Sequence, residues 1–245
     1  MNRTAIEWSE LTWNPVFGCT KVSPGCQKCY AERIARRIGK DFSKVEIKPH
    51  KLEEPLRIKQ PKMIFVNSMS DLFHEEIPDE FIGQVFDVMH KADWHTYQIL
   101  TKRPGRMAAW IDENLDNGVL DHIWLGTSVE MSMYMHRLEP LLSIEDCKVH
   151  FISFEPLLAS CVTRFDGQEV LDLTDIEWVI TGGESDYSSP RRANPDWFRE
   201  IRDEALAEKI PYFHKQNGGT TKCSCHGAWG CRVLDGKIWN QVPLK

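Results

Sequence analysis

Short apolar segments alternate with amphipathic segments along most of this chain. The apolar segments contain β-branched and aromatic residues and predict strands. The segments between them repeat apolar positions every three or four residues, as helices do. Alternation of this kind predicts βαβ units and a parallel sheet. The predicted strands are residues 62–67, 97–100, 123–126, 149–152, 178–180 and 211–213, and the predicted helices are residues 80–92, 105–114, 131–142 and 196–209.

Further segments complete this organisation. Residues 13–18 are predicted as a first strand and residues 30–38 as a helix, while residues 159–175 interrupt the pattern and suggest an insertion with a small hairpin over Asp166-Gly167. We predict an α/β protein in which residues 1–216 form a full or partial parallel (β/α) barrel. Residues 217–245 would form a short C-terminal tail. A doubly wound sheet is the alternative fold.

The predicted strands end in polar residues. In a parallel barrel, the C-terminal strand ends share one rim, and active sites are built there. Lys and Glu recur at these ends beside Gly, Ser and Asn, which predicts a shared polar cavity. The ends are Asn67-Ser68 and residues 101–103, 127–130, 153–155, 181–184 and 214–216.

Composition agrees with a globular protein. The chain has 245 residues, of which 42% are hydrophobic and 27% charged, enough to bury a core. The start does not resemble a signal peptide, and no apolar run is long enough to cross a membrane. We therefore expect a cytoplasmic protein with reduced thiols. A net charge of −6 disfavours non-specific coating of nucleic acid. Local basic groups are either solvated or bind phosphates: Arg33, Arg36, Arg37, Lys40, Arg191 and Arg192.

Six of the eight cysteines fall into two clusters, whereas Cys147 and Cys161 stand alone and are expected to be buried apolar residues. Clustered thiols in a reducing compartment favour metal binding. Cys19, Cys26 and Cys29 form the first cluster. Because a [4Fe–4S] cluster normally takes four thiolates, three would leave one iron open to a small ligand. The alternatives are a zinc ion with His74 or another distant residue as its fourth ligand, or a redox pair of Cys26 and Cys29.

The second cluster lies in the predicted tail. Cys223, Cys225, His226 and Cys231 supply enough donors for tetrahedral zinc. His214 is an alternative fourth donor, and a second iron–sulfur cluster is an alternative to zinc. Either metal would fasten a Gly-rich tail that has little core of its own.

Several motifs resemble those of a known family. They are "TWNPVFGCTKVSPGCQKCYAER", "LTKRP", "WLGTSVE", "FISFEPLL", "WVITGGES" and "CHGAWGCRVLDG". Over nearly the whole chain, they resemble the phage-associated three-cysteine-motif proteins, a family without an assigned function. That family in turn resembles radical S-adenosylmethionine (SAM) enzymes, which are partial barrels with three cluster cysteines after the first strand. Here six residues separate Cys19 from Cys26, more than the three that are commonest in those enzymes.

The resemblance implies a mechanism. Cys19, Cys26 and Cys29 would hold a [4Fe–4S] cluster, and SAM would chelate its open iron. An electron from an external donor would then cleave SAM to methionine and a 5′-deoxyadenosyl radical. The resemblance also assigns residues to roles. Tyr30 would pack on the cluster or the adenine, Asn67, Ser68 and Asp71 would meet the SAM amino group, Ser128 and Glu130 would meet the ribose, and Glu155, Glu184 and Lys215 would face the substrate or the methionyl carboxylate.

The expected substrate is a nucleoside, a nucleotide or a nucleic-acid base. Trp8, Trp13, Trp229 and Trp239 either stack on bases or pack in the interior. A second hypothesis is a non-catalytic, zinc-stabilised binding module that acts as the partner of another phage protein.

Overall fold

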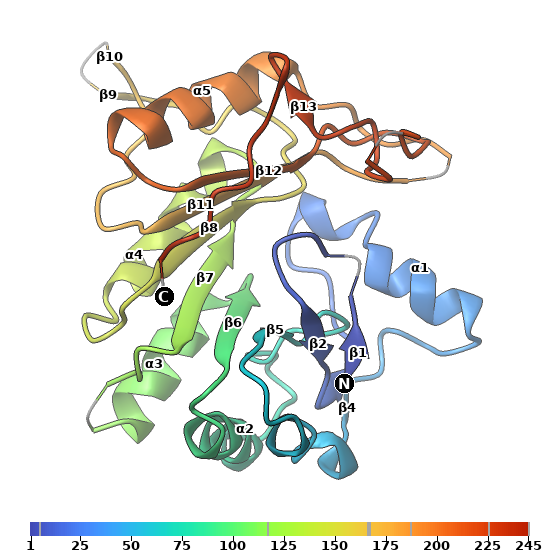
Figure 1. The fold of residues 1–245 in the computed structure, drawn as a ribbon, viewed down its shortest axis with the longest axis vertical. Helices are drawn as coiled ribbons and strands as arrows, with labels where there is room; N and C mark the ends of the chain where they lie inside the picture. The colour runs from blue at the N-terminus through green and yellow to red at the C-terminus, as the bar shows by residue number, and fades with distance from the viewer. Residues whose placement is uncertain (5, 117, 166–167, 187, 225, 245) are drawn as a thin grey trace.

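A single curled sheet forms the body of the protein (Figure 1). The computed structural model describes residues 1–4, 6–116, 118–165, 168–186, 188–224 and 226–244. Within them, eight strands pair in the order β1-β2-β5-β6-β7-β8-β11-β12. Neighbours from β2 to β12 are parallel, and β1 is antiparallel to β2. The strands are β1 (Asn2–Arg3), β2 (Leu11–Trp13), β5 (Met63–Val66), β6 (Thr96–Thr101), β7 (Ile123–Ser128), β8 (His150–Phe154), β11 (Trp178–Gly182) and β12 (Tyr212–Gln216).

This strand order decides between the two predicted folds. A doubly wound sheet reverses its strand order at a switch point, whereas here the order follows the chain from one edge to the other. Within the described residues, β1 and β12 remain unpaired with each other. The prediction of a partial parallel barrel is therefore confirmed, and the seven parallel strands form a half-barrel.

Helices pack against the outer face of the half-barrel (Figure 1). The predicted helix over residues 131–142 is only partly correct, because the chain there forms a 3₁₀ helix (Ser132–Arg137) before α4. A continuous helix would place Pro140 in its interior, where proline removes a backbone hydrogen bond; in α4 it lies in the first turn. The helices are α1 (Tyr30–Arg37), α2 (Asp79–Lys91), α3 (Pro104–Asn114), α4 (Leu138–Leu142) and α5 (Pro195–Ala207).

The predicted strand over residues 13–18 is also divided. The sheet contains β2, which ends at Trp13, and the chain then forms β3 (Val16–Phe17), which pairs with β4 (Glu46–Ile47) outside the main sheet. Pro15 lies at the break and has no N–H to donate to a strand ladder. The break turns the chain toward the first cysteine cluster.

The two faces of the sheet bury different sets of side chains. In β5, Ile64 and Val66 face the outer core, whereas Phe65 faces inward. Gly126 makes room for the inner ring of Phe151, since a side chain at residue 126 would overlap it. The bottom of the half-barrel is thereby filled with large side chains, and its polar rim stays open. The buried inner residues are Trp8, Phe65, Trp124, Val149, Phe151, Trp178, Ile180 and Phe213.

The remaining segments lie at the periphery. β9 (Thr163–Phe165) and β10 (Gln168–Val170) pair antiparallel and confirm the predicted hairpin; its predicted turn, Asp166-Gly167, lies outside the described residues. After β13 (Val233–Leu234) and β14 (Lys237–Ile238), the chain runs antiparallel beside β12 through a Phe213–Asn240 bridge. The division at residue 217 stays a prediction. No helix in the described ranges combines the length and apolar character that a membrane crossing requires.

Candidate functional site

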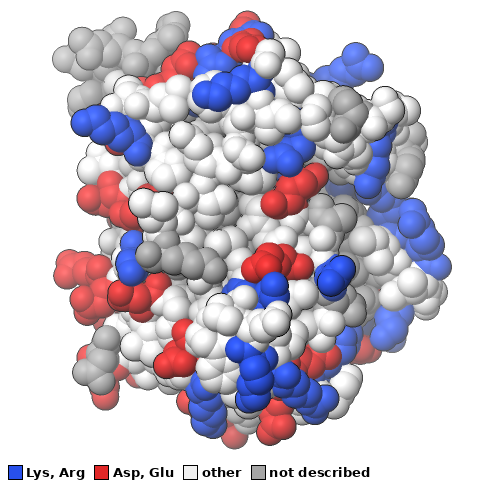
Figure 2. Space-filling model, in the orientation of Figure 1, with Lys and Arg blue, Asp and Glu red and all other residues white. Residues whose placement is uncertain are grey.

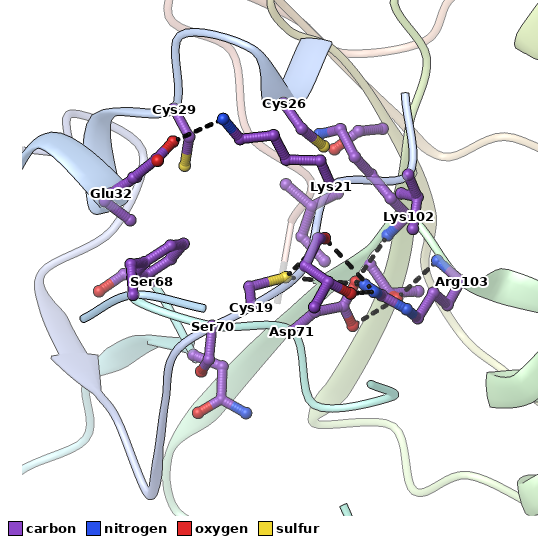
Figure 3. A pocket seen from close by; sticks show the side chains of 18 of the residues that line it. Cys19, Lys21, Cys26, Cys29, Glu32, Ser68, Ser70, Asp71, Lys102 and Arg103 are labelled. Carbon is purple, nitrogen blue, oxygen red and sulfur yellow. Dashed lines mark hydrogen bonds and ion pairs between the residues drawn. The ribbon is translucent and has the colours of Figure 1, made fainter. Parts of the chain in front are cut away.

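Cys19, Cys26 and Cys29 line one cavity of about 450 Å³ at the C-terminal end of the sheet. Figure 3 shows their sulfur atoms turned toward the same space. Gly18 makes the approach to Cys19 possible. Its backbone has a φ of +90°, and a side chain there would overlap the carbonyl oxygen of Lys44. This cavity is called the larger cavity below.

Two short helices present the other two thiols. Cys26 ends the 3₁₀ helix Pro24–Cys26, and Cys29 is the residue that precedes α1. None of the three cysteines forms a disulfide. The loop from Cys19 to Cys29 is called the cysteine loop below.

The spacing of the three sulfurs argues against a single metal ion. Zn–S bonds of about 2.3 Å would hold thiolates about 3.8 Å apart around tetrahedral zinc. Among the described residues, Cys223, His226 and Cys231 form the one group of three donors found close enough to hold a metal ion, and the three cysteines of the loop do not form such a group. An iron–sulfur cube binds each thiolate to a different iron and therefore suits a wider spacing.

His74, the predicted additional zinc ligand, is occupied. It is fully buried, its Nδ1 accepts from the Glu76 N–H at 3.2 Å, and its Nε2 lies 2.7 Å from Oγ1 of Thr20. Since Nδ1 accepts, Nε2 carries the proton and donates to Thr20. Burial lowers the pKa of His74, which keeps the ring neutral. His74 therefore holds the cysteine loop in place instead of facing a metal.

Arg103 connects the cysteine loop to the sheet. Its Nη1 lies 3.7 Å from Sγ of Cys19 and 3.2 Å from Oδ2 of Asp71. Its Nη2 donates to Oγ1 of Thr20 at 2.9 Å, and its Nε donates to Glu75 at 3.0 Å. The arginine side chain is 10% exposed, so its charge is only weakly screened and favours negative charge on the nearby sulfur.

The thiols of Cys19 and Cys29 are protonated in the metal-free protein at neutral pH. Burial, followed by the charge of Asp71, raises the pKa of Cys19 to about 11, although Arg103 opposes this shift. Burial also raises the pKa of Cys29, against the backbone N–H groups of Glu32 and Ala31 at the start of α1. A metal that binds these sulfurs must displace their protons.

Asn67 carries an unsatisfied, buried amide at the wall of the larger cavity. It lines the cavity, is 3% exposed, and neither its Oδ1 nor its Nδ2 has a hydrogen-bond partner. Its backbone has a φ of +61°, a conformation that asparagine tolerates better than most residues. A buried amide without partners costs about 1–3 kcal/mol, and a bound polar ligand would remove that cost.

The other predicted cofactor-binding residues have different surroundings. Tyr30, Ser68, Asp71 and Ser128 line the larger cavity. The carboxylate of Asp71 already accepts from Oγ1 of Thr101 at 2.7 Å and from the Lys102 N–H at 3.1 Å, so it also fixes the end of β6. The Tyr30 hydroxyl donates to the carbonyl of Ser68 at 2.5 Å.

Glu130 does not line the larger cavity. It is fully buried beneath the cysteine loop, where it accepts from Oγ of Ser23 at 2.5 Å and from Nη1 of Arg137 at 2.9 Å. Gly25 lies directly against its carboxylate. The predicted ribose ligand thus serves in the structure as the support on which the cysteine loop rests.

A smaller cavity of about 180 Å³ adjoins the larger one. Glu155, Glu184 and Lys215, the predicted catalytic residues, all line it. Nζ of Lys215 lies 3.1 Å from Oε1 of Glu155, and Oγ of Ser153 donates to Oε2 of Glu155 at 3.1 Å. The two cavities share part of their lining: Cys26, Cys29, Tyr30, Phe65, Leu100, Lys102 and Ser128.

Arg191 closes the rim between the smaller cavity and the cysteine loop. Its guanidinium pairs with the buried carboxylate of Glu184 and donates to the carbonyl of Pro24 at 2.9 Å. This pairing engages the side chain of Arg191, which the sequence analysis considered as a residue that could bind phosphate. It also holds the loop against the β11 end of the sheet.

Cys223, His226 and Cys231 form a compact group in the tail. Their donor atoms all lie within 4.8 Å of one another, so they could hold a metal ion, as predicted. Cys225 lies outside the described residues. His214 cannot serve as a further donor in this conformation, because its ring nitrogens lie 2.9 Å from Oγ1 of Thr181 and 3.0 Å from Oδ1 of Asn217.

The match to a family model covers nearly the whole chain. The model described as "Protein of unknown function (DUF5131)" matches residues 3–243. The chain belongs to the DUF5131 family. No curated protein and no solved structure matches it. Because the DUF5131 description names no activity, the resemblance to phage-associated proteins and to radical-SAM enzymes stays a prediction, as do the roles of the site residues.

The surface of this DUF5131 protein has a basic side. Figure 2 shows Lys and Arg side chains gathered on the edge where α1 lies, and Arg36, Arg37 and Lys40 are exposed there. Arg33 is instead engaged, and donates to the carbonyl of Ser185 at 3.1 Å. Of the tryptophans considered for base stacking, Trp8 and Trp13 are buried and pack in the two cores.

Sequence reasoning missed several residues of this DUF5131 site. The sequence pattern marks Ser23 and Gly25 only as part of a turn. It marks Lys102 and Arg103 only as polar residues that follow a strand. Their contacts depend on long-range packing, since Ser23 and Glu130 are 107 positions apart. The one usable signal was that both basic residues directly follow a strand, on the rim where the cysteine loop was expected.

Proposed function

We propose that this protein is a radical-SAM-type enzyme. In this proposal, Cys19, Cys26 and Cys29 hold a [4Fe–4S] cluster in the larger cavity, SAM binds beside it, and the substrate enters the smaller cavity. The observation that supports the proposal most directly is the geometry of the cysteine loop. Three thiols face one cavity at the mouth of a half-barrel, and they are not among the donor groups found close enough to hold a single ion.

The donor set fits this group. Three thiolates leave one iron of a cube without a protein ligand, and the unsatisfied amide of Asn67 lines the same cavity. Lys102 and Arg103 also line it and would offset the negative charge of the thiolates. When bound, the cluster would supply the electron for reductive cleavage of SAM, after receiving it from an external donor.

The protein's own residues would orient the ligands. Asn67 would hydrogen-bond the polar end of SAM, and Asp71 would keep Arg103 and the end of β6 in position. Because the two cavities share lining residues, the reactive end of SAM would lie next to the substrate. The buried floor of the smaller cavity would keep water from the reaction.

A nucleobase-sized substrate suits the smaller cavity. Its lining combines the apolar rings of Trp8 and Phe65 with the charged pair of Glu155 and Lys215. A base has flat faces that stack on aromatic rings and polar edges that hydrogen-bond. A nucleoside, a nucleotide or an extruded base of a nucleic acid is therefore the proposed substrate.

The alternative of a non-catalytic zinc module has weaker support at the cysteine loop. It needs a closed four-ligand site, but both ring nitrogens of His74 are already engaged. The three thiols also do not form a group close enough to hold one ion, which further disfavours the zinc module. A role as the partner of another phage protein would then rest on the exposed basic side near α1.

Anaerobic reconstitution with iron and sulfide tests the proposal. We expect about four irons per chain, and release of 5′-deoxyadenosine from SAM when a strong reductant is added. Changing Cys19, Cys26 and Cys29 to alanine should abolish both, whereas Cys147→Ala, a thiol outside both cavities, should abolish neither. Stoichiometric zinc bound at the cysteine loop would overturn the proposal. Iron binding without SAM cleavage would overturn its SAM part.

A further inference from the structure

The compact group in the tail has the geometry of a mononuclear site. Sγ of Cys231 lies 3.7 Å from Nδ1 of His226. Tetrahedral zinc, with bonds of about 2.3 Å to sulfur and about 2.0 Å to nitrogen, holds such a pair about 3.5 Å apart. This pair is therefore within a few tenths of an ångström of the spacing that zinc imposes, and all donor atoms of the group lie within 4.8 Å of one another. The three thiols of the cysteine loop, by contrast, do not form a group close enough to hold one ion.

The backbone is shaped to bring these donors together. The Cys223 N–H donates to the carbonyl of Ala228 at 2.8 Å, and the Gly227 N–H donates back to the carbonyl of Cys223 at 2.9 Å. Cys231 has a φ of +83°, a strained conformation for a residue other than glycine, and such strain often marks a functional position. A side chain at Gly230 would overlap the carbonyl oxygen of Gly218, so the loop must pack closely on the preceding segment.

That preceding segment is hydrogen-bonded to the wall of the smaller cavity. The Asn217 N–H donates to the carbonyl of Cys231 at 2.9 Å, and the Gly218 N–H donates to the carbonyl of Trp229 at 2.9 Å. The next residue, Gly219, donates its N–H to the carbonyl of Glu184 at 2.9 Å. Glu184 lines the smaller cavity and pairs with Arg191. A continuous set of hydrogen bonds therefore joins the donor group to the cavity wall.

We propose that Cys223, His226 and Cys231 bind one zinc ion, and that this ion holds residues 217–219 and 229–231 against the wall of the smaller cavity formed by Gly183, Glu184 and Ser185. Thiolate and imidazole donors at mononuclear spacing select zinc over hard cations such as Mg²⁺. The tail is glycine-rich and has few buried side chains of its own, so a metal crosslink would supply order that packing does not. The site is structural, and it does not depend on the cluster proposed for the cysteine loop.

Metal analysis of the full-length chain tests the zinc site. We expect about one zinc per chain, and its loss in Cys231→Ser and in Cys223→Ser. Cys147→Ser is the matched control and should keep the zinc. The triple alanine variant of Cys19, Cys26 and Cys29 should also keep it, so that failure here is distinguishable from failure of the proposed enzyme. Zinc retained in Cys231→Ser, or iron bound in its place, would overturn the proposal.

Hydrogen exchange of the unaltered chain tests the link to the cavity wall, even if the variants fail to fold. Removal of zinc by a chelator should raise amide exchange several-fold in peptides that cover residues 183–186 and 217–224. Peptides from α2 serve as the internal control and should be unchanged. If zinc removal leaves exchange in residues 183–186 unaltered, the ion does not support the wall.

Discussion

The carboxylate of Glu130 fills the space that a side chain at residue 25 would occupy. Ser23, in the same turn, donates a hydrogen bond to this carboxylate, and Arg137 pairs with it from the other side. Glu130 has no exposed surface. The turn between Cys19 and Cys26 is thus seated on a buried ion pair, which fixes the position of Cys26 relative to the sheet.

Replacing Gly25 by alanine should therefore disturb the cysteine loop. The added methyl group would displace Glu130 or the turn, and overpacking of this kind costs about 1–3 kcal/mol. We expect a lower free energy of unfolding in urea and less iron bound after reconstitution. Gly105 is a suitable control because nothing lies within 4 Å of a side chain built there, and in helix α3 an alanine should be neutral or stabilising. Full iron binding by Gly25→Ala would show that the loop can reach its position without this contact.

Arg103 should be irreplaceable by lysine. Its guanidinium contacts Cys19, Thr20 and Asp71 at once, and an ammonium group cannot reproduce that forked geometry. We expect Arg103→Lys to lower the free energy of unfolding by about 2–3 kcal/mol, from the loss of hydrogen bonds to charged and buried groups. Arg36→Lys is the control, since the Arg36 side chain is 80% exposed, and it should change stability by less than about 0.5 kcal/mol. Equal effects of the two variants on thermal unfolding would contradict this role.

The sequence predicted the fold better than it predicted the contacts of the site. Hydrophobic runs identified the parallel strands, because strands buried on both faces are nearly continuous in apolar residues. The polar ends placed Asn67, Glu155 and Lys215 on one rim, because parallel strands end at the same edge. By contrast, no local pattern shows that Arg191 pairs with Glu184 and reaches Pro24, since that contact forms only once the barrel has curled.

The same distinction explains the position of Glu130. A carboxylate that follows a strand was expected to face the cavity. Gly25 and Arg137 instead create a pocket for it beneath the loop, and neither is adjacent to it in sequence. Local position on the rim was predictable, whereas the direction of the side chain depends on tertiary packing.

Asn67 should contribute to ligand binding more than to folding. Glycine accepts the positive φ of this position, so Asn67→Gly removes only an amide that has no partner. We expect SAM to bind the reconstituted variant about five- to tenfold more weakly, which corresponds to one lost hydrogen bond of about 1 kcal/mol. Iron content should be unchanged, and calorimetric titration would measure the affinity.

Asn14 provides the contrasting variant. Its Oδ1 accepts from the Met69 N–H at 3.0 Å and from Oγ of Ser68 at 3.1 Å. Asn14→Ala should therefore reduce the free energy of unfolding by about 1–3 kcal/mol, because it leaves these donors unpaired. If Asn67→Gly destabilises the ligand-free protein as much as Asn14→Ala and leaves SAM affinity intact, Asn67 is structural and its assignment to the ligand is wrong.

His214 should make the protein sensitive to acid. It is fully buried in β12, and burial lowers its pKa to about 4, compared with about 6.5 in an unfolded chain. As the pH falls, the unfolded chain binds the proton first, so the free energy of unfolding falls between pH 6.5 and 4 and this contribution is constant below that range. Between pH 7 and pH 5 the loss from this residue alone should be about 2 kcal/mol.

His214→Gln cannot be protonated and should lose correspondingly less stability over that interval, whatever its stability at pH 7. Urea unfolding of both proteins at the two pH values measures the difference, and any acid-induced loss of metal affects them equally because they contain the same thiols. Parallel losses in the two proteins would mean that His214 is protonated in the native state near its ordinary pKa, and that the burial seen around its ring does not exclude the charge.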